Sequence, residues 1–191
     1  MCLDDCPDGS FADPNVHVCV ETCSATPNLY AENDTNTCVD ICPNGTFADD
    51  STRICVEDCP FSESTFADSL TNRCVLTCPV SDFTYADNIT RACEHVCTYN
   101  GTYKSYADNS TLTCVTVCPE DPDYYADDLS QTCVEVCPNT TTPRVFADNS
   151  SRICVPLCNL TEYFYSDNST GECLTVCPGG YFADDYTHSC V

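Results

Sequence analysis

Several residue types that build large cores, catalytic sites and anion-binding surfaces are scarce in this sequence. It contains no Trp, one Met, six Gly and three His, and its 30 acidic residues outnumber six Lys and Arg, giving a formal charge of −24. Phosphate binding requires clustered Lys and Arg, so we expect no nucleic-acid partner. Long hydrophobic runs are also missing, and none approaches the ~20 residues of a membrane span. We therefore expect no direct membrane insertion.

Cysteine, in contrast, is abundant. It occupies 21 of 191 positions, a density typical of a disulfide scaffold. Cysteines at this density persist as disulfides in oxidising compartments, which predicts an extracellular or cell-surface location. The acidic residues are spread along the chain, so neighbouring segments repel one another and an extended array is favoured.

The cysteines recur as C-x3-C pairs, spaced 17, 19 or 21 residues apart. The pairs are Cys2/Cys6, Cys19/Cys23, Cys38/Cys42, Cys55/Cys59, Cys74/Cys78, Cys93/Cys97, Cys114/Cys118, Cys133/Cys137, Cys154/Cys158 and Cys173/Cys177, and Cys190 begins another. Met1 precedes Cys2 directly, leaving no room for a secretory leader. We therefore expect a mature or trimmed piece of a longer protein.

One aromatic residue per repeat lies eight residues before the next cysteine. These are Phe11, Tyr30, Phe47, Phe66, Tyr85, Tyr106, Tyr125, Phe146, Tyr165 and Phe182. The aromatic follows the preceding cysteine by five, seven or nine residues. Steps of two preserve the face of a strand, so this variable segment is interpreted as extended chain or a hairpin tip growing by strand pairs. We expect each aromatic to cover the disulfide of its own repeat.

An acidic residue, here called the corner residue, follows two positions after each aromatic. These residues are Asp13, Glu32, Asp49, Asp68, Asp87, Asp108, Asp127, Asp148, Asp167 and Asp184. Thr or Ser follows three positions later in nine of the ten repeats. Asp, Ser and Thr side chains cap the N–H groups of tight turns, so we expect a turn at each corner.

Several disulfide pairings are compatible with this order of cysteines. An extended C-x3-C segment places its two Cα atoms ~13 Å apart, too far for a bridge. The simplest scheme closes ten loops, worth roughly 3 kcal/mol each. They are Cys6–Cys19, Cys23–Cys38, Cys42–Cys55, Cys59–Cys74, Cys78–Cys93, Cys97–Cys114, Cys118–Cys133, Cys137–Cys154, Cys158–Cys173 and Cys177–Cys190. Cys2 is left unpaired within the chain and would pair with a preceding repeat.

The segment from Cys55 to Cys78 combines two C-V-x-x-C strings with F-x-x-x-x-T-x-x-C between them. This pattern resembles the single-disulfide modules of furin-like cysteine-rich domains in growth-factor receptors, and it is similar to tandem cysteine-rich surface proteins of unicellular eukaryotes. The resemblance covers the whole chain and supports the same loop pairing. The two-disulfide modules and the long dimerisation loop of the receptors are missing from this sequence, so receptor function does not follow.

The predicted fold is therefore a small disulfide-rich one, made mostly of short β-hairpins and irregular loops in a linear tandem-repeat rod. The alternative is a β-solenoid with one coil per repeat, stacked at ~4.8 Å, with the aromatics forming a ladder. A solenoid coil has a constant length, so the two-residue steps argue against this alternative.

Nine Asn-x-Ser/Thr motifs predict N-glycosylation on exposed turns. The acceptors are Asn33, Asn44, Asn88, Asn100, Asn109, Asn139, Asn149, Asn159 and Asn168. Repeats one, four, seven and ten have no acceptor. In three of these, an apolar residue stands in the corner turn: Leu70, Leu129 and Tyr186. If each repeat rotates by about a third of a turn, these residues form a glycan-free stripe, a candidate assembly contact.

Metal binding and catalysis are the competing uses of these residues. Zinc sites favour C-x2-C or C-x4-C spacing, so no metal site is predicted from the cysteines. Paired Asp residues such as Asp49-Asp50, Asp127-Asp128 and Asp184-Asp185 leave weak calcium binding as an alternative to turn capping. His17, His95 and His188 are interpreted as lying at unrelated positions of their repeats, with no nucleophile or phosphate loop beside them. We therefore expect neither an enzyme nor a cofactor other than glycans.

Two functions fit these expectations. The first is an extracellular structural glycoprotein, a repeat unit of a fibril, surface coat or stalk, whose partners are further copies of the array or neighbouring chains. The alternative is a binding module, such as a surface antigen or receptor ectodomain. That alternative directs attention to the longest loops, before Tyr106 and Phe146, which contain Lys104 and Arg144.

Overall fold

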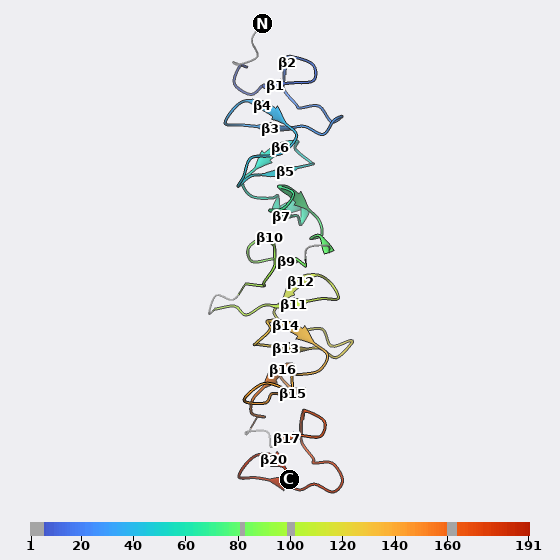
Figure 1. Ribbon diagram of the computed structural model, residues 1–191. Helices are drawn as coiled ribbons and strands as arrows, with labels where there is room; N and C mark the ends of the chain where they lie inside the picture. Colours follow the sequence, from blue (N-terminus) through green and yellow to red (C-terminus); the bar gives the residue numbers. More distant parts are fainter. Residues whose placement is uncertain (1–5, 81–82, 99–101, 160–163) are drawn as a thin grey trace. The chain divides into compact units, whose positions relative to one another are not determined.

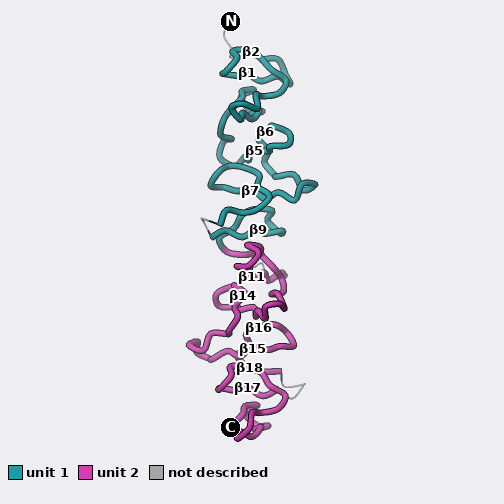
Figure 2. Tube along the Cα trace, turned by 90° about the vertical axis from the view of Figure 1, so that its right-hand side faces the viewer, with its two compact units in different colours: residues 1–95 teal, residues 96–191 magenta. Residues whose placement is uncertain are grey.

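A computed structural model describes residues 6–80, 83–98, 102–159 and 164–191. The chain forms two compact units, residues 1–95 and residues 96–191, coloured separately in Figure 2. In the described residues of both units, each repeat folds into one antiparallel hairpin of two- or three-residue strands (Figure 1). The expectation of a disulfide-rich tandem array of short hairpins and irregular loops is confirmed.

The strands of unit 1 are β1 (Phe11–Asp13), β2 (Val18–Val20), β3 (Tyr30–Glu32), β4 (Thr37–Val39), β5 (Phe47–Asp49), β6 (Ile54–Val56), β7 (Phe66–Asp68), β8 (Arg73–Val75), β9 (Tyr85–Asp87) and β10 (Ala92–Glu94), with one 3-10 turn, η1 (Phe61–Glu63). Those of unit 2 are β11 (Tyr106–Asp108), β12 (Thr113–Val115), β13 (Tyr125–Asp127), β14 (Thr132–Val134), β15 (Phe146–Asp148), β16 (Ile153–Val155), β17 (Tyr165–Asp167), β18 (Glu172–Leu174), β19 (Ala183–Asp184) and β20 (Ser189–Cys190).

The hairpin of repeat 1 shows the plan that the other repeats follow. In β1 and β2, Ala12 lies opposite Cys19 and Asp13 lies opposite Val18. The turn closes through a hydrogen bond from the N–H of His17 to the carbonyl of Asp13, 2.9 Å long. His17 has a φ of 56°, in the left-handed region. We call this position, directly before the second strand, the left-handed residue; its occupants are His17, Asn36, Arg53, Asn72, Arg91, Leu112, Gln131, Arg152, Gly171 and His188.

Neighbouring hairpins within each unit are joined by a short parallel pairing. Ala12 of β1 lies opposite Thr37 of β4, and its N–H donates to the carbonyl of Asn36 at 2.8 Å. Unit 1 is therefore a ladder in the order β2-β1-β4-β3-β6-β5-β8-β7-β10-β9, and unit 2 repeats this order from β12 to β19. Because parallel and antiparallel pairings alternate, successive hairpins point in opposite directions, as the strand arrows of Figure 1 show.

The solenoid alternative is wrong for a specific reason. A solenoid stacks equivalent strands of successive coils on one another. Here, the first strand of one repeat pairs with the second strand of the next, as β3 does with β6 and β13 with β16. Each repeat first closes on itself as a hairpin and then contributes one bridge to its neighbour.

Ten disulfides join the same cysteine pairs as the simplest scheme, from Cys6–Cys19 to Cys177–Cys190. The Cα–Cα distances of these pairs are 5.5–5.7 Å, within the usual range for disulfides. Cys2 lies outside the described residues.

The aromatic residues pack differently from the expectation. Phe11 lies in a cluster with Cys23 and Cys38, whose disulfide closes the following repeat. Tyr125 likewise packs on Cys137 and Cys154 of its following repeat. The bridge from Ala12 to Asn36 places the following hairpin against the strand that carries Phe11. The core of the array is therefore a series of small clusters shared between successive repeats, and each repeat depends on the next for burial of its aromatic ring.

The variable segments are closed turns rather than growing strand pairs. Five-residue segments close with a hydrogen bond across three residues, as from the N–H of Thr46 to the carbonyl of Pro43 at 3.0 Å. Three of the seven-residue segments close across five residues, as from the N–H of Leu29 to the carbonyl of Ser24 at 2.9 Å. In these five- and seven-residue segments, the additional residues lie inside a turn. The segment length changes in steps of two because the chain must enter the first strand on the same face.

Candidate functional site at the joint between repeats

The contact between one repeat and the next, here called the joint, gathers most of the chemically distinctive side chains of the chain. Eight joints lie within the two units, four in each. In every one, the residue after the aromatic donates its N–H to the carbonyl of the next left-handed residue, with distances of 2.8–2.9 Å. The donors are Ala12, Ala31, Ala48, Ala67, Ala107, Ala126, Ala147 and Ser166. The left-handed backbone at the acceptor turns its carbonyl toward the preceding repeat.

Tyrosine hydroxyls add a second contact across the joint. The hydroxyl of Tyr106 donates to Asp128 at 2.6 Å, and that of Tyr165 donates to Asp185 at 2.6 Å. Tyr30 makes the same bond to Asp50. Each acceptor is the post-corner residue, the residue directly after the corner residue of the next repeat. Tyr125 bonds to a post-corner Asn149 in the same way.

These bonds change the acidity of both partners. The hydroxyl of Tyr30 lowers the pKa of Asp50, with Arg73 lowering it further. Burial raises the pKa of Tyr30, and the bond to Asp50 raises it again. At neutral pH, the phenol therefore keeps its proton and the carboxylate stays charged, which favours a charge-assisted hydrogen bond.

All six basic residues of the chain lie at joints. At the three left-handed positions occupied by Arg, each guanidinium lies 4.6–4.9 Å from the ring centroid of the preceding aromatic, and one of its N–H groups donates to a carbonyl of the preceding loop at 2.6–2.8 Å. These residues are Arg53 over Tyr30, Arg91 over Phe66 and Arg152 over Tyr125. Arg73 joins Asp50 at 2.8 Å and also reaches Tyr30. The basic residues therefore fasten repeats together.

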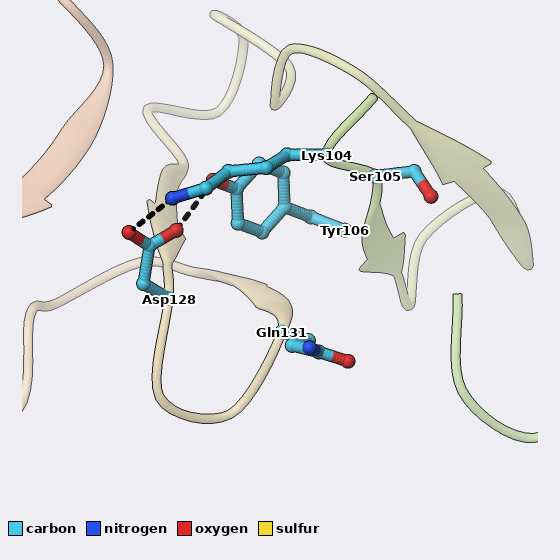
Figure 3. A pocket seen from close by; sticks show the side chains of 5 residues that line it. All are labelled: Lys104, Ser105, Tyr106, Asp128 and Gln131. Carbon is cyan, nitrogen blue, oxygen red and sulfur yellow. Dashed lines mark hydrogen bonds and ion pairs between the residues drawn. The ribbon is translucent and has the colours of Figure 1, made fainter. Parts of the chain in front are cut away.

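The nine-residue loops supply their cation from the opposite side of the joint. Lys104 extends from the loop before Tyr106 and pairs with Asp128 at 2.6 Å. Figure 3 shows the Lys104 ammonium and the Tyr106 hydroxyl converging on this carboxylate. These residues and Gln131 line a pocket of about 220 Å³. The Asp128 pKa is raised by burial, but the bonds from Lys104 and Tyr106 lower it below its ordinary value. Both nine-residue loops thus contain a basic residue two positions before the aromatic, Lys104 in one and Arg144 in the other. Arg144 donates to Asn168 of the next repeat at 3.2 Å.

Loop length and the next left-handed residue are therefore matched within each unit. Five-residue loops are followed by Asn36 and Asn72, and the Asn72 amide donates to the carbonyl of Cys42 at 3.2 Å. Seven-residue loops are followed by Arg53, Arg91, Arg152 and His188, and the nine-residue loops by Gln131 and Gly171. A seven-residue loop leaves a carbonyl that the Arg of the next repeat can reach. A nine-residue loop contains its own basic residue, which contacts the next repeat in place of that Arg.

Arg152 provides a test of the energetic role of the joint. Its side chain is 12% exposed, and it contacts both the Asp123 carboxylate and the Pro119 carbonyl. We expect Arg152→Met to lower the free energy of unfolding by about 2 kcal/mol because a buried charged hydrogen bond is lost. The control, Lys104→Met, removes a half-exposed ion pair and should cost less than about 1 kcal/mol. Urea unfolding of the unreduced protein compares the two, and equal losses would contradict the assignment.

The corner carboxylates cap their own turns. Asp148 accepts from the N–H of Ser150 at 2.9 Å and from the hydroxyls of Ser150 and Ser151 at 2.7 Å. Burial raises the pKa of Asp148, but these bonds outweigh it and the pKa lies below its ordinary value. The pKa values of Glu32, Asp49, Asp108 and Asp167 are lowered by the same balance. The recurring acidic residues are thus accounted for by turn capping.

Acid should remove this contribution to stability. A carboxyl group with a lowered folded-state pKa stabilises the fold above its unfolded pKa of about 4, and loses that effect as pH falls through the folded value. We expect the melting temperature to stay high down to about pH 4 and to fall steeply below it. Circular dichroism of the unreduced protein in about 0.5 M salt, which screens charge repulsion, measures this directly. A melting temperature that rises steadily to pH 2 would exclude the corner carboxylates as stabilisers.

The predicted glycosylation acceptors are mostly on the surface. Seven of the eight described acceptors are exposed, while Asn159 is half-buried and Asn100 lies outside the described residues. Asn149 and Asn168 accept their hydrogen bonds through the side-chain oxygen, which leaves the nitrogen that would be glycosylated outside those bonds. In the acceptor motifs at corners, the Ser or Thr hydroxyl binds the corner carboxylate, as Thr111 binds Asp108 at 2.7 Å. Turn geometry therefore explains the hydroxyl, but not the Asn.

The three apolar turn residues are also exposed: Leu70 by 62%, Leu129 by 77% and Tyr186 by 95%. The sequence interpretation did not include the alternation of the corner turns. Because neighbouring hairpins reverse direction, their corner turns lie alternately at the two edges of each ladder. The common stripe of the three residues stays a prediction.

Two histidines are less unrelated than the sequence interpretation held. His17 and His188 both occupy the left-handed position, and the ring of His188 stacks on Tyr165 with 6.1 Å between centroids. His188 thereby takes the place that Arg takes at other joints. Across the part of the chain that the structure describes, no three His, Cys, Asp or Glu side chains are grouped so as to hold a metal ion.

Sequence reasoning missed the joint, although a signal for it exists. Asp occurs at the post-corner position only after a repeat whose aromatic is Tyr: Asp50 follows Tyr30, Asp128 follows Tyr106 and Asp185 follows Tyr165. Comparison of each repeat with its predecessor, rather than alignment of all repeats to one consensus, would have revealed the pairing.

Ten disulfides suggest an extracellular or secreted protein. A search of the described residues for helices finds none with the length and apolar character needed to cross a bilayer. Comparison of the chain with protein-family models, with curated proteins and with solved structures finds no match.

Proposed function

We propose that this chain is an extracellular structural glycoprotein, a repeat unit of a fibril, surface coat or stalk. The observation that supports this most directly is the use of all six basic residues in joints. An array built in this way can be lengthened by adding repeats without changing its chemistry. The outer surface keeps the excess of acidic residues, which promotes solubility and spacing between neighbours.

Glycosylation belongs to the same proposal. The corner turns require Ser or Thr but not Asn, and yet Asn occupies the post-corner position in five repeats: Asn33, Asn88, Asn109, Asn149 and Asn168. Glycans on these exposed turns would form a hydrated coat around the array. Three exposed apolar residues belong to repeats that have no glycosylation acceptor: Leu70, Leu129 and Tyr186. They form the proposed assembly contact with further copies or neighbouring chains.

The proposed relationship to furin-like cysteine-rich modules is consistent with one disulfide and one hairpin per repeat. It concerns module geometry and does not carry receptor function. The hollow beside Lys104 is the place where the binding-module alternative would begin, but its cation and its carboxylate already bind each other at 2.6 Å. That pairing favours the structural function.

Electron microscopy of native, unreduced material tests the proposal. Long uniform fibrils or an ordered coat, with glycans confirmed by mass spectrometry after enzymatic deglycosylation, are the expected result. Isolated short particles that bind a soluble protein would instead identify a displayed ectodomain. A chain without glycans at any of the exposed acceptors would contradict the glycoprotein part of the proposal.

A further inference from the structure

Repeat 10 exposes the face that every other joint in its unit buries. Phe182 is 78% exposed, whereas the aromatics of the preceding four repeats, Tyr106, Tyr125, Phe146 and Tyr165, are at most 8% exposed. Those four rings pack against a following repeat: Tyr106, Tyr125 and Phe146 lie on its disulfide, and Tyr165 lies against its His188 ring. The environment of Phe182 thus lacks the disulfide and small side chain that complete the cluster elsewhere.

The backbone of repeat 10 is prepared for the same contact. Ala183 lies opposite Cys190 in the hairpin, and Phe182 exchanges both of its hydrogen bonds with Val191 at 2.9 and 3.0 Å. This register turns the N–H of Ala183 away from its own hairpin. The equivalent N–H groups at Ala107, Ala126, Ala147 and Ser166 all donate to the next left-handed carbonyl.

We infer that this face, consisting of Phe182, Ala183 and the loop from Cys177, is a docking surface for a further cysteine-rich repeat of the same class with Asn as its left-handed residue. Continuity with the eight joints supplies the geometry. Loop length predicts that the left-handed residue of this partner is Asn. The reason is that Cys177–Phe182 is a five-residue segment, like Cys6–Phe11 and Cys42–Phe47. Those two segments are followed by Asn36 and Asn72.

The aromatic residue restricts the partner further. Phe182 has no hydroxyl, so a post-corner Asp in the partner would lack the donor that a Tyr supplies at other joints. Within the units, Phe is followed by Asn33, Ser69, Asn88 and Asn168, and never by Asp. A second copy of this chain would present His17 and Pro14 at these two positions, and His occurs elsewhere only after a seven-residue loop. The surface therefore fits an Asn-bearing repeat better than the first repeat of a second copy.

The chain itself provides matched probes. A copy of residues 21–39, which contains Asn33 and Asn36, continues the sequence in register when fused after Val191. A copy of residues 40–56 contains Asp50 and Arg53 and is the mismatched control. The measurement is hydrogen exchange at the Ala183 amide, followed by mass spectrometry, in the full chain with each extension. Disulfide mapping confirms that each added repeat has closed its own loop.

We expect the matched extension to slow exchange at Ala183 by at least about 30-fold, and the mismatched one by less than about 5-fold. Arg53→Asn together with Asp50→Ser in the appended control copy should restore the slow exchange. A copy of residues 57–75, with Ser69 and Asn72, is a second matched probe should the first fail to close its disulfide. Equal exchange with matched and mismatched repeats would overturn the inference. Slow exchange that appears in the unextended chain with rising concentration would overturn it in favour of a second copy.

Discussion

Replacing Cys118 and Cys133 by Ser is expected to cost about 3 kcal/mol from loop closure alone, since the disulfide closes 15 residues of sequence separation. A further loss should follow because Tyr106 of the preceding repeat packs on both cysteines. Repeat arrays unfold by local openings, so hydrogen exchange resolved by repeat is the appropriate measurement. We expect faster exchange in the altered repeat and also in the one before it.

The double variant of Cys6 and Cys19 is the matched control. This disulfide has a sequence separation of 13, but Cys19 is exposed and no described aromatic side chain covers it. The control variant should therefore lose only the loop-closure contribution to the free energy of unfolding. Equal destabilisation of both variants would contradict the shared clusters as the source of stability. Complete reduction should unfold the array, because the clusters that remain are too small to order it.

Replacing Asp148 by Ala is the second substitution with a large expected effect. Three donors, one backbone N–H and two hydroxyls, converge on this buried carboxylate. We expect a loss of about 2 kcal/mol because a partly buried N–H is left without its acceptor and a charged hydrogen-bond partner is removed. Asp148→Asn keeps one acceptor oxygen and should cost about half as much. Thermal and urea unfolding of the unreduced variants compare them.

Asp184 offers the control for this substitution. It caps the turn of repeat 10 through Tyr186 and Thr187, but both bonds are exposed. Water can replace a lost acceptor there, so Asp184→Ala should destabilise the protein much less than Asp148→Ala. A loss at Asp184 as large as that at Asp148 would show that burial is not what makes the corner carboxylates important.

The local structure of the repeat was predictable because it depends on residues close in sequence. Corner turns follow from Asp and a hydroxyl three positions later, and closure of each loop follows from the cysteine spacing. The direction of aromatic packing was not predictable from a consensus. Phe11 lies nearer in sequence to its own cysteines than to those of repeat 2. Its packing on repeat 2 depends on a bridge between Ala12 and Thr37 that involves a different repeat.

The candidate site was missed for a related reason. The sequence analysis named Lys104 only as a residue of a long loop, and it did not single out Arg152. Their role depends on Asp128 and Asp123, which lie 24 and 29 residues away. Contacts of this kind are invisible to motif searches within one repeat. They are visible when residues are compared at a fixed offset between neighbours.

The hydrogen bond from the residue after each aromatic to the next left-handed carbonyl gives each unit a direction. Hairpins reverse from one repeat to the next, but this bond always runs from the earlier repeat as donor to the later repeat as acceptor. Each repeat within a unit is therefore polar, with a donor and an aromatic ring on the face toward the next repeat, and an acceptor and a disulfide on the face toward the preceding one. Two like faces offer two donors or two acceptors to each other. Any assembly that uses these faces must be head-to-tail, and its two tips must differ in chemistry.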